Sequence, residues 1–277
     1  MSDWAFFDSS RFAVGGTVAI TGGGTVTANS IINTKGVWQN LVPSVPFDAD
    51  IITTEMFILN FSGNPLDNFL VDIGKGTAGA EQIIASNLIV QANRETHGYY
   101  YKFPYVIGAG EALSARAQCS IASQVVSVGF HFESHGFAHF PSGSRMKTYG
   151  ANASTSRSTM IPASSPANAK GSWTQIVNST SEDICEILIS LVPEDDVGVG
   201  TEWFLIDIGI GPAGSEKIII PDLSASSYNQ PNSNNSLNPC TIGPIPVSIP
   251  ASSRIAVRMQ HSSTFFDIGV IIVGISR

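Results

Sequence analysis

The sequence predicts an all-β protein made of two tandem, duplicated antiparallel β-sandwich domains of jelly-roll-like type, each preceded by a leading arm. Three observations predict this fold: a long internal repeat, short apolar segments with period-2 alternation, and turn residues between those segments. No window keeps apolar residues at the 3.6-residue spacing of an amphipathic helix, so helices should be few and short. We expect residues 1–138 to form the first module and residues 139–277 to form the second.

The internal repeat is clearest where residues 69–84 are set beside residues 204–219. The two segments read FLVDIGKGTAGAEQII and FLIDIGIGPAGSEKII, and eleven of their sixteen positions are identical. The same offset of 135 places Lys35 on Lys170 and Trp38 on Trp173, and from Pro104 onward the offset becomes 142. The second copy therefore carries seven extra residues, within a stretch whose Ser, Asn and Pro content predicts a long loop over residues 224–244.

Period-2 alternation places the other elements in order along the chain. Predicted strands cover residues 52–61, 69–73, 82–90 and 125–132 in the first copy, and 185–191, 203–208, 217–220 and 254–259 in the second. Alternate apolar residues bury one face of each strand, as two packed sheets require. In the first leading arm, residues 17–27 alternate on both sides of three consecutive glycines, which predicts a hairpin. The order of the strands in the sheets does not follow from one sequence.

The composition favours assembly with other proteins. Only 13% of residues are charged, against about 25% in ordinary soluble domains, so the surface is neutral and costs little to desolvate. The net charge is −8 and basic residues are scattered singly, so we expect no direct nucleic-acid partner. We also expect no membrane partner, because the chain begins without a signal-peptide pattern and its longest apolar run is far shorter than about 20 residues.

Three cysteines, Cys119, Cys185 and Cys240, lie far apart and form no C-x-x-C pair. This spacing supports neither a disulfide framework nor a zinc site built from cysteines. Buried free thiols are the favoured interpretation.

The pattern Gly74-x-Gly76-x-x-Gly79 recurs as Gly209-x-Gly211-x-x-Gly214 and matches the dinucleotide-binding fingerprint letter for letter. That fingerprint requires a helix after the glycines, but another β-rich segment follows in both copies. The proline that follows Gly211 also removes a backbone donor from the second loop. We therefore expect no cofactor, and glycines that supply positive φ angles to a tight, bulged strand connection.

Two pairs of acids also recur in register, Asp72 with Glu81 and Asp207 with Glu216. Paired carboxylates can act as acid and base or bind calcium. Because Asp72 alternates with apolar neighbours, it should face away from the core, where it can cap the glycine turn or pair across strands. No nucleophile or histidine accompanies either pair, so we expect no catalytic and no metal-binding residues.

Trp38 and Trp173 precede apolar residues that match in the repeat, so we expect them to be core residues or anchors between the modules. A role as sugar-binding platforms is the alternative.

Seven residues are candidates for contacts with other molecules: Tyr99, Tyr100, Tyr101, His131, His135, His139 and Tyr228. The tyrosines lie where the two copies diverge, and loops carry function more often than strands. They can equally form an anchor or a simple strand edge. The histidines are absent from the second copy, and their spacing of four shares a face only in a helix, which this strand-like sequence does not support. A solvated chain exit is the simplest interpretation, followed by a histidine cluster between subunits and then by a metal site.

The segments Gly-x-Trp-x-Gln from Gly171, Phe-Leu-Ile-Asp-Ile-Gly-Ile-Gly from Phe204, and the apolar run before Pro221 resemble segments of tailed-bacteriophage virion proteins. The nearest likeness is to capsid decoration (cement) proteins. It is clearest over residues 171–223 and weaker over residues 36–84. The resemblance implies β-rich modules that gather, often as trimers, at local symmetry axes and clamp neighbouring major capsid proteins after expansion. Its motif belongs to the scaffold and assigns no functional residue.

The expectation is thus a non-enzymatic virion protein, made in the host cytoplasm and located on the outer capsid surface. Its expected partners are the major capsid protein and other copies of itself, as a homotrimer. Two tandem modules with low-charge surfaces fit multivalent binding through individually weak contacts. The family pattern does not require two copies, so a tail or baseplate protein that binds a glycan or receptor stays open. A glycan hydrolase that uses the repeated acids is a third possibility.

Overall fold

The computed structural model describes residues 17–58, 68–77, 79–91, 98–134, 145–193, 200–229, 236–238, 240–262 and 267–276. Within these ranges the chain forms eighteen β-strands and no helix, so the all-β prediction is confirmed. For residues 17–23, 193, 200–201, 227–229 and 236–238 only the backbone is described. No helix of the described part is long and apolar enough to cross a membrane.

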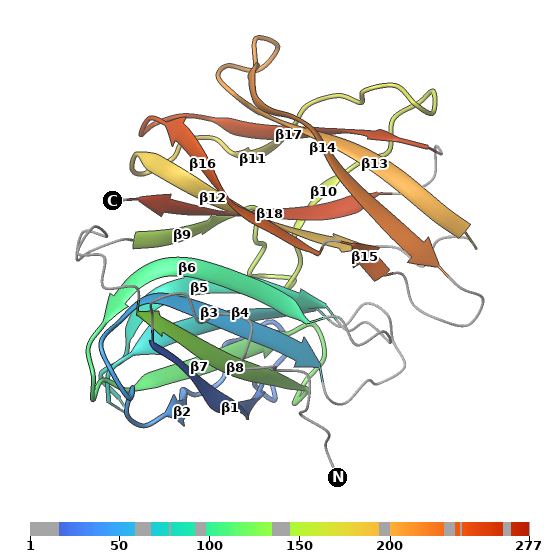
Figure 1. The fold of residues 1–277 in the computed structure, drawn as a ribbon. Coiled ribbons are helices and arrows are strands. Elements are labelled where there is room, and N and C mark those ends of the chain that lie inside the picture. The colour runs from blue at the N-terminus through green and yellow to red at the C-terminus, as the bar shows by residue number, and fades with distance from the viewer. Residues whose placement is uncertain are drawn as a thin grey trace.

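Module 1 is a sandwich of two four-stranded antiparallel sheets (Figure 1). Its strands are β1 (Thr17–Thr27), β2 (Gln39–Val42), β3 (Ala49–Ile58), β4 (Asn68–Lys75), β5 (Gln82–Gln91), β6 (Tyr99–Ile107), β7 (Leu113–Cys119) and β8 (Val125–Ser134). The sheet orders are β1-β8-β3-β6 and β2-β7-β4-β5. Successive strands thus alternate between the sheets, except for β4 and β5, which are neighbours in one sheet. This is the connectivity of a jelly roll.

Module 2 repeats this arrangement. Its strands are β9 (Arg145–Tyr149), β10 (Thr159–Ile161), β11 (Thr174–Val177), β12 (Ile184–Pro193), β13 (Gly200–Ile210), β14 (Lys217–Asn229), β15 (Ser236–Asn238), β16 (Thr241–Ile249), β17 (Ile255–His261) and β18 (Ile268–Ser276). The sheet orders are β10-β18-β12-β16, with β9 also paired to β18, and β11-β17-β13-β14-β15. The expected division between the modules, after residue 138, lies outside the described residues.

The registers show that the repeat in the sequence is a repeat in space. Gly24 pairs with Val128 in module 1, and the residues at offsets 135 and 142, Thr159 and Val270, pair in module 2. Each sandwich buries the alternate apolar residues of its two sheets, such as Val128, Phe130 and Phe132 of β8. Alternation in the sequence therefore identified the core faces correctly.

Two local predictions are wrong. Residues 17–27 form the single strand β1 and not a hairpin, because the three glycines take up an irregularity in the pairing with β8 between Thr21 and Gly24. The predicted long loop over residues 224–244 is wrong at both ends, because β14 continues to Asn229 along β13 and β16 begins at Thr241. Residues 230–235 and 239 lie outside the described residues. The Ser and Asn residues of the outer strand β14 have a composition typical of loops, but their backbones still form the hydrogen bonds of the sheet.

The leading strand differs between the modules. In module 1 two residues separate Thr21 from Gly24, whereas in module 2 nine residues separate the equivalent positions, Tyr149 and Thr159. This second insertion of seven residues splits the strand into β9 and β10. We call residues 150–158 the clasp loop, because it reaches module 1.

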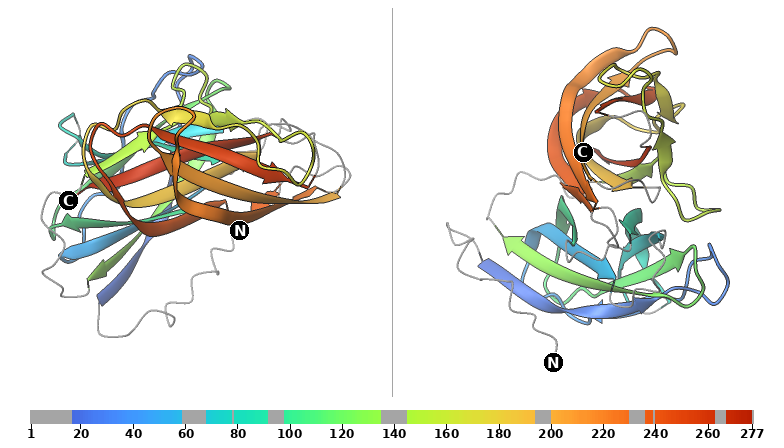
Figure 2. Two further views of the ribbon diagram at one scale, coloured as in Figure 1. Left: turned by 90° about the horizontal axis from the view of Figure 1, so that it is seen from above. Right: turned by 90° about the vertical axis from the view of Figure 1, so that its right-hand side faces the viewer.

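The modules are packed together through an apolar contact (Figures 1 and 2). Leu188, Ile271, Val273 and Ile275 project from the outer face of the β18-β12 sheet and join the core cluster of module 1. Edge strands β5 and β6 of module 1 lie against β9 and β16. All nine residues of β18 are consequently buried. A strand covered on both faces reads as a continuous apolar run, which is what residues 268–275 show.

Candidate functional site

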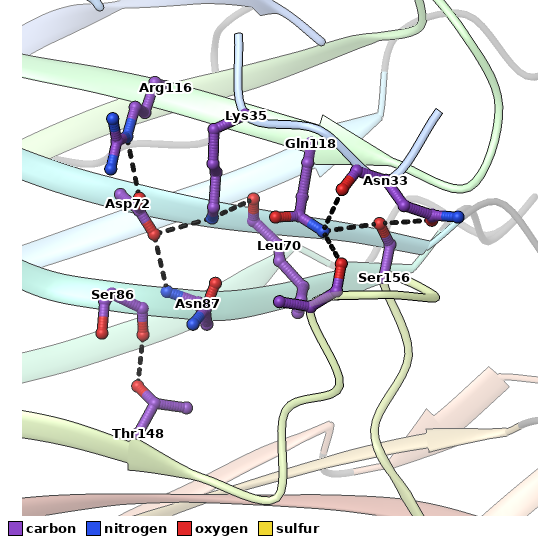
Figure 3. Close-up of polar contacts among 11 residues, drawn as sticks. Asn33, Lys35, Leu70, Asp72, Ser86, Asn87, Arg116, Gln118, Thr148 and Ser156 are labelled. Atoms are coloured by element: carbon purple, nitrogen blue, oxygen red, sulfur yellow. Dashed lines mark hydrogen bonds and ion pairs between the residues drawn. The ribbon is translucent and has the colours of Figure 1, made fainter. Parts of the chain in front are cut away.

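The two repeated aspartates, Asp72 and Asp207, each form a polar site, and Figure 3 shows the one around Asp72. Asp72 is almost fully buried on the outer side of β4. Its Oδ1 accepts hydrogen bonds from Lys35 Nζ at 2.7 Å and from the Asn87 amide at 2.9 Å, and its Oδ2 accepts one from Arg116 Nε at 2.9 Å. We call these four residues the aspartate anchor. It joins the segment before β2 to β4, β5 and β7.

Module 2 contains the same anchor. Asp207 accepts hydrogen bonds from Lys170 Nζ at 2.7 Å, the Asp222 amide at 2.9 Å and Arg258 Nε at 2.8 Å. Burial alone would raise the pKa of Asp207, but these hydrogen bonds outweigh burial and hold the pKa below its usual range. Lys170 additionally contacts Asp222 Oδ1 at 2.7 Å.

The two lysines differ in their surroundings. Burial lowers the pKa of Lys35, although Asp72 opposes the shift. Both aspartates already hold three donors from their own module, so each carboxylate is part of the scaffold. The prediction that Asp72 pairs across strands is confirmed. Sequence reasoning assigns no role to Lys35 or Arg116, and their recurrence as Lys170 and Arg258 is the signal that identifies them.

The second acids of each pair stabilise the turns. Glu81 Oε2 accepts a hydrogen bond from the Gly79 amide at 2.9 Å, and Glu216 pairs with Arg254 at 2.8 Å. Among the described residues, no group of three or more His, Cys, Asp or Glu side chains is placed to hold a metal ion.

The tryptophans extend the anchors. The Arg116 guanidinium lies 4.5 Å from the centre of the Trp38 ring, and Arg258 lies 4.6 Å from that of Trp173. Both rings are half-buried on the outer face of their own module. The expectation that they lie in the core or between the modules is therefore wrong: the guanidinium, itself fixed by the buried aspartate, holds the ring against the sheet.

The glycine fingerprint has two separate structural causes. Gly76 and Gly79 have φ angles of 121° and 87°, and Gly211 and Gly214 repeat them, which confirms the predicted tight connection between strands. Gly74 has no such angle, but a Cβ there would lie 2.9 Å from the Trp38 ring. The first glycine of the pattern thus makes room for the indole. β5 and β14 follow the turns, so the helix that a dinucleotide site needs is not there.

The tyrosines lie at the contact between the modules. Tyr99 and Tyr101 are buried. Tyr101 Oη donates to the Ile89 carbonyl at 2.7 Å and accepts from Ser190 Oγ of module 2 at 2.9 Å. Tyr100 is 48% exposed and donates to Glu55 Oε1 at 2.6 Å. Of the three tyrosines, Tyr100 is thus the one with a surface available to a further molecule.

The histidines and Tyr228 are only partly described. His131 is half-buried on β8, where burial lowers its pKa and Glu133 opposes the shift. His135 and His139 lie outside the described residues. Tyr228 belongs to β14, and its side chain lies outside the description. The three cysteines are thiols outside any disulfide; Cys119 is buried, whereas Cys185 and Cys240 are half-buried.

The clasp loop adds polar contacts to the apolar contact between the modules (Figure 3). Gln118 Nε2 of β7 donates to the Ala153 carbonyl at 2.7 Å and to Ser156 Oγ at 3.0 Å. Ser156 Oγ in turn donates to Asn33 Oδ1 at 2.8 Å. Thr148 of β9 also donates to the Ser86 carbonyl. Two separate places on module 1 are therefore bound by module 2, which fixes the two sandwiches relative to each other.

No known protein family and no curated protein matches the sequence. Among solved structures, the STIV MCP, from Sulfolobus turreted icosahedral virus, is similar over 94% of this chain and 96% of its own, with 9% identity and a TM-score of 0.39. PNGF-II matches over 94% of this chain and 65% of its own, with 8% identity and a TM-score of 0.33. The T13 IBDV viral particle matches over 93% and 69%, with 10% identity and a TM-score of 0.27. Likeness at this level carries no argument about function.

Proposed function

We propose that this chain is a non-enzymatic structural protein of a phage virion, a capsid decoration (cement) protein that binds and stabilises the shell of major capsid protein. The observation that carries the proposal is that the two modules, which are fixed relative to each other, each expose an equivalent isoleucine on their surface. Ile83 and Ile218 are equivalent in the repeat, and they are 47% and 40% exposed. Each pairs with the glycine under the tryptophan of its module.

An exposed isoleucine that is retained in both copies is not required by either core. Because the modules are fixed to each other, the two isoleucine surfaces lie at a constant separation. A rigid body with two like surfaces fits a partner that repeats in space, such as a capsid lattice, and the second contact then forms without a new loss of translational freedom. Self-association as a homotrimer at the outer capsid surface belongs to the same proposal.

The repeated acids support a structural role over hydrolysis. A glycan hydrolase needs one carboxyl group that can donate a proton and a second one that can attack or activate water. Asp72 and Asp207 instead accept three hydrogen bonds each from their own module. We therefore propose no chemical step for either residue.

The test is co-sedimentation of the purified chain with expanded phage capsids and, separately, its binding to host surface glycans. We expect stoichiometric binding to capsids, a higher capsid melting temperature and no glycan binding. The variants Ile83→Lys and Ile218→Lys should each lower apparent capsid affinity by about 100-fold, because binding falls back to one contact. Val106→Lys is the matched control, since Val106 is 41% exposed but has Ser248 at the equivalent position. Glycan binding without capsid binding would overturn the proposal.

A glycan- or receptor-binding role in a tail or baseplate is the second candidate. Trp203 favours it, because 60% of this residue is exposed at the start of β13 and exposed aromatic rings bind sugars by stacking. Trp38 and Trp173 give it less support, since an arginine covers one face of each ring. If this candidate is correct, Trp203→Ala abolishes glycan binding and leaves the fold intact.

A further inference from the structure

Strand β1 is an unprotected sheet edge, unlike the other edge strands of the described chain. It has eleven residues and contains no proline and no charged residue. It pairs with β8 on one side and is the last strand in its sheet. A long, uncharged edge strand is a template for pairing with another chain, and proteins normally block such edges.

The other edges are blocked in recognisable ways. β16 carries Pro244 and Pro246, which have no amide hydrogen to donate. β5 and β6 are covered by module 2. β9 carries Arg145 and Lys147. The edge strands β2, β10, β11 and β15 have only three or four residues each. β15 covers β14 only at Ser226–Tyr228, and the rest of β14 carries Lys217, Pro221 and Asp222.

Half of β1 is also occupied. With its side-chain amide oriented to satisfy both groups, Gln39 donates to the Thr25 carbonyl at 2.8 Å and accepts from the Thr27 amide at 2.9 Å. The side-chain amide of Gln39 thus makes the hydrogen bonds that a neighbouring strand would make with this end of β1. The irregularity between Thr21 and Gly24 separates it from the other half, where no described residue plays the same part over Thr17–Thr21.

We propose that Thr17–Thr21 pairs with the same segment of a second copy of this chain, antiparallel and about a two-fold axis at Ala19. The segment reads Thr-Val-Ala-Ile-Thr. In this register Thr17 faces Thr21 of the other copy and Val18 faces Ile20. Thr opposite Thr and β-branched residues opposite each other are favourable cross-strand pairs, and no charges meet.

The pairing closes on itself, because a two-fold contact uses the same surface on both copies. It would join the β1-β8-β3-β6 sheets of two chains into one continuous eight-stranded sheet. β1 lies on the side of module 1 away from module 2, so module 2 does not obstruct a second copy (Figures 1 and 2). This contact is independent of the proposed capsid function and separate from any three-fold contact of a trimer.

Cysteine cross-linking tests the register. At a two-fold axis the two Ala19 Cα atoms would lie about 4.5–5.5 Å apart, which is within the range of a disulfide. Ala19→Cys should therefore give a disulfide-linked dimer under mild oxidation. Thr27→Cys, in the half occupied by Gln39, and the wild-type chain with its three native cysteines should not. Equal cross-linking of Ala19→Cys and Thr27→Cys overturns the proposal.

Charge exchange tests the partner. In module 1 the register places Val18 opposite Glu133 and Ile20 opposite His131. The variants Val18→Lys/Ile20→Lys and Val18→Glu/Ile20→Glu should each weaken self-association by about tenfold or more, because like charges then face each other across the axis. An equimolar mixture of the two variants should associate again as a heterodimer. Ser248→Lys, on the proline-blocked edge strand β16, is the matched control and should associate like the wild type.

Three outcomes overturn the proposal. The first is sedimentation that finds no two-fold contact in the wild-type chain at any concentration. The second is that the two charge variants associate as well as the wild type while their circular dichroism shows the native fold. The third is pairing through β1 only when capsids are added, because the occupant of the edge is then a capsid protein and not a second copy.

Discussion

Strands β8 and β18 occupy equivalent places in the two sandwiches, but their outer faces are opposite in character. Gly129, His131 and Glu133 of β8 correspond to Ile271, Val273 and Ile275 of β18. β8 alternates and keeps half-buried positions, whereas every residue of β18 is buried. The inner faces of both strands remain apolar. The core thus constrains one face of a strand, and the neighbours of the module determine the other.

The largest effect is expected where a charge enters the contact between the modules. Val273→Glu should cost more than about 4 kcal/mol of unfolding free energy or prevent folding, because it buries an unpaired carboxylate. The equivalent change in module 1, His131→Glu, should cost less than about 1 kcal/mol, since that side chain is half-exposed. Urea unfolding of both variants measures the difference. Similar losses for the two would show that the outer faces are not distinct.

The aspartate anchors should also differ between the modules. Removing one partner from a buried ion pair costs several kcal/mol, so Asp72→Asn should lose about 3 kcal/mol. Asp207→Asn should lose less, because Lys170 keeps its contact with Asp222. The double variant Asp207→Asn/Asp222→Asn should then approach the loss of Asp72→Asn. Thermal unfolding tests this order, and a larger loss for Asp207→Asn than for Asp72→Asn would contradict it.

The contribution of the clasp loop to stability should be measurable by comparing substitutions at two equivalent glutamines. Gln118→Ala removes the donor to Ala153 and Ser156 and should cost about 1–2 kcal/mol, because the hydroxyl of Ser156, which is buried, loses this partner. Gln260, its equivalent in module 2, is half-exposed, and Gln260→Ala should change the stability by about 0.5 kcal/mol or less. Hydrogen exchange over residues 150–158 should rise in the first variant only.

The smallest effect is a pH dependence that only module 1 can show. Burial raises the pKa of Glu55, although a hydrogen bond from Tyr100 opposes the shift, and the equivalent residue in module 2 is Ser190. A raised folded-state pKa means that the folded chain binds the proton more tightly than the unfolded chain. The stabilisation is therefore complete below the unfolded pKa, about 4.5, and is lost as the pH rises through the folded pKa.

Glu55→Gln removes this proton equilibrium. The unfolding free energy of the wild type relative to Glu55→Gln should fall as the pH rises from about 4.5. Contributions from other groups, such as Asp207, cancel in this difference. A difference that stays constant or increases over that pH range would contradict the assignment.

Much of the fold follows from local sequence patterns. The repeat, the alternation and the glycine turns predict two β-sandwiches, because each depends on residues close together in the chain. The strand order depends on long-range pairing and appears only in the structure. The apolar run at residues 268–275 contains more information than its length. It is too short to cross a membrane, and its lack of alternation additionally indicates a strand buried on both faces.

The candidate site was less predictable, because each anchor brings together residues from four separate parts of the chain. Asp72 alone suggests many roles, and only its distances to Lys35 and Arg116 assign one. Alternation could have placed two of the tyrosines: in a strand, Tyr99 and Tyr101 share a face and Tyr100 lies opposite. The role of Gln118 depends on a loop that belongs to the other module, and no local pattern indicates it.

The clasp loop also changes what the covalent connection between the modules has to do. Its hydrogen bonds and the apolar face of β18 hold the sandwiches together through residues that are not part of the covalent connection, residues 135–144. A chain cut within that connection should therefore remain one particle, and two separately made halves should find each other in solution. Duplication would then have produced a heterodimer in a single polypeptide, whose linker ensures equal numbers of the two halves.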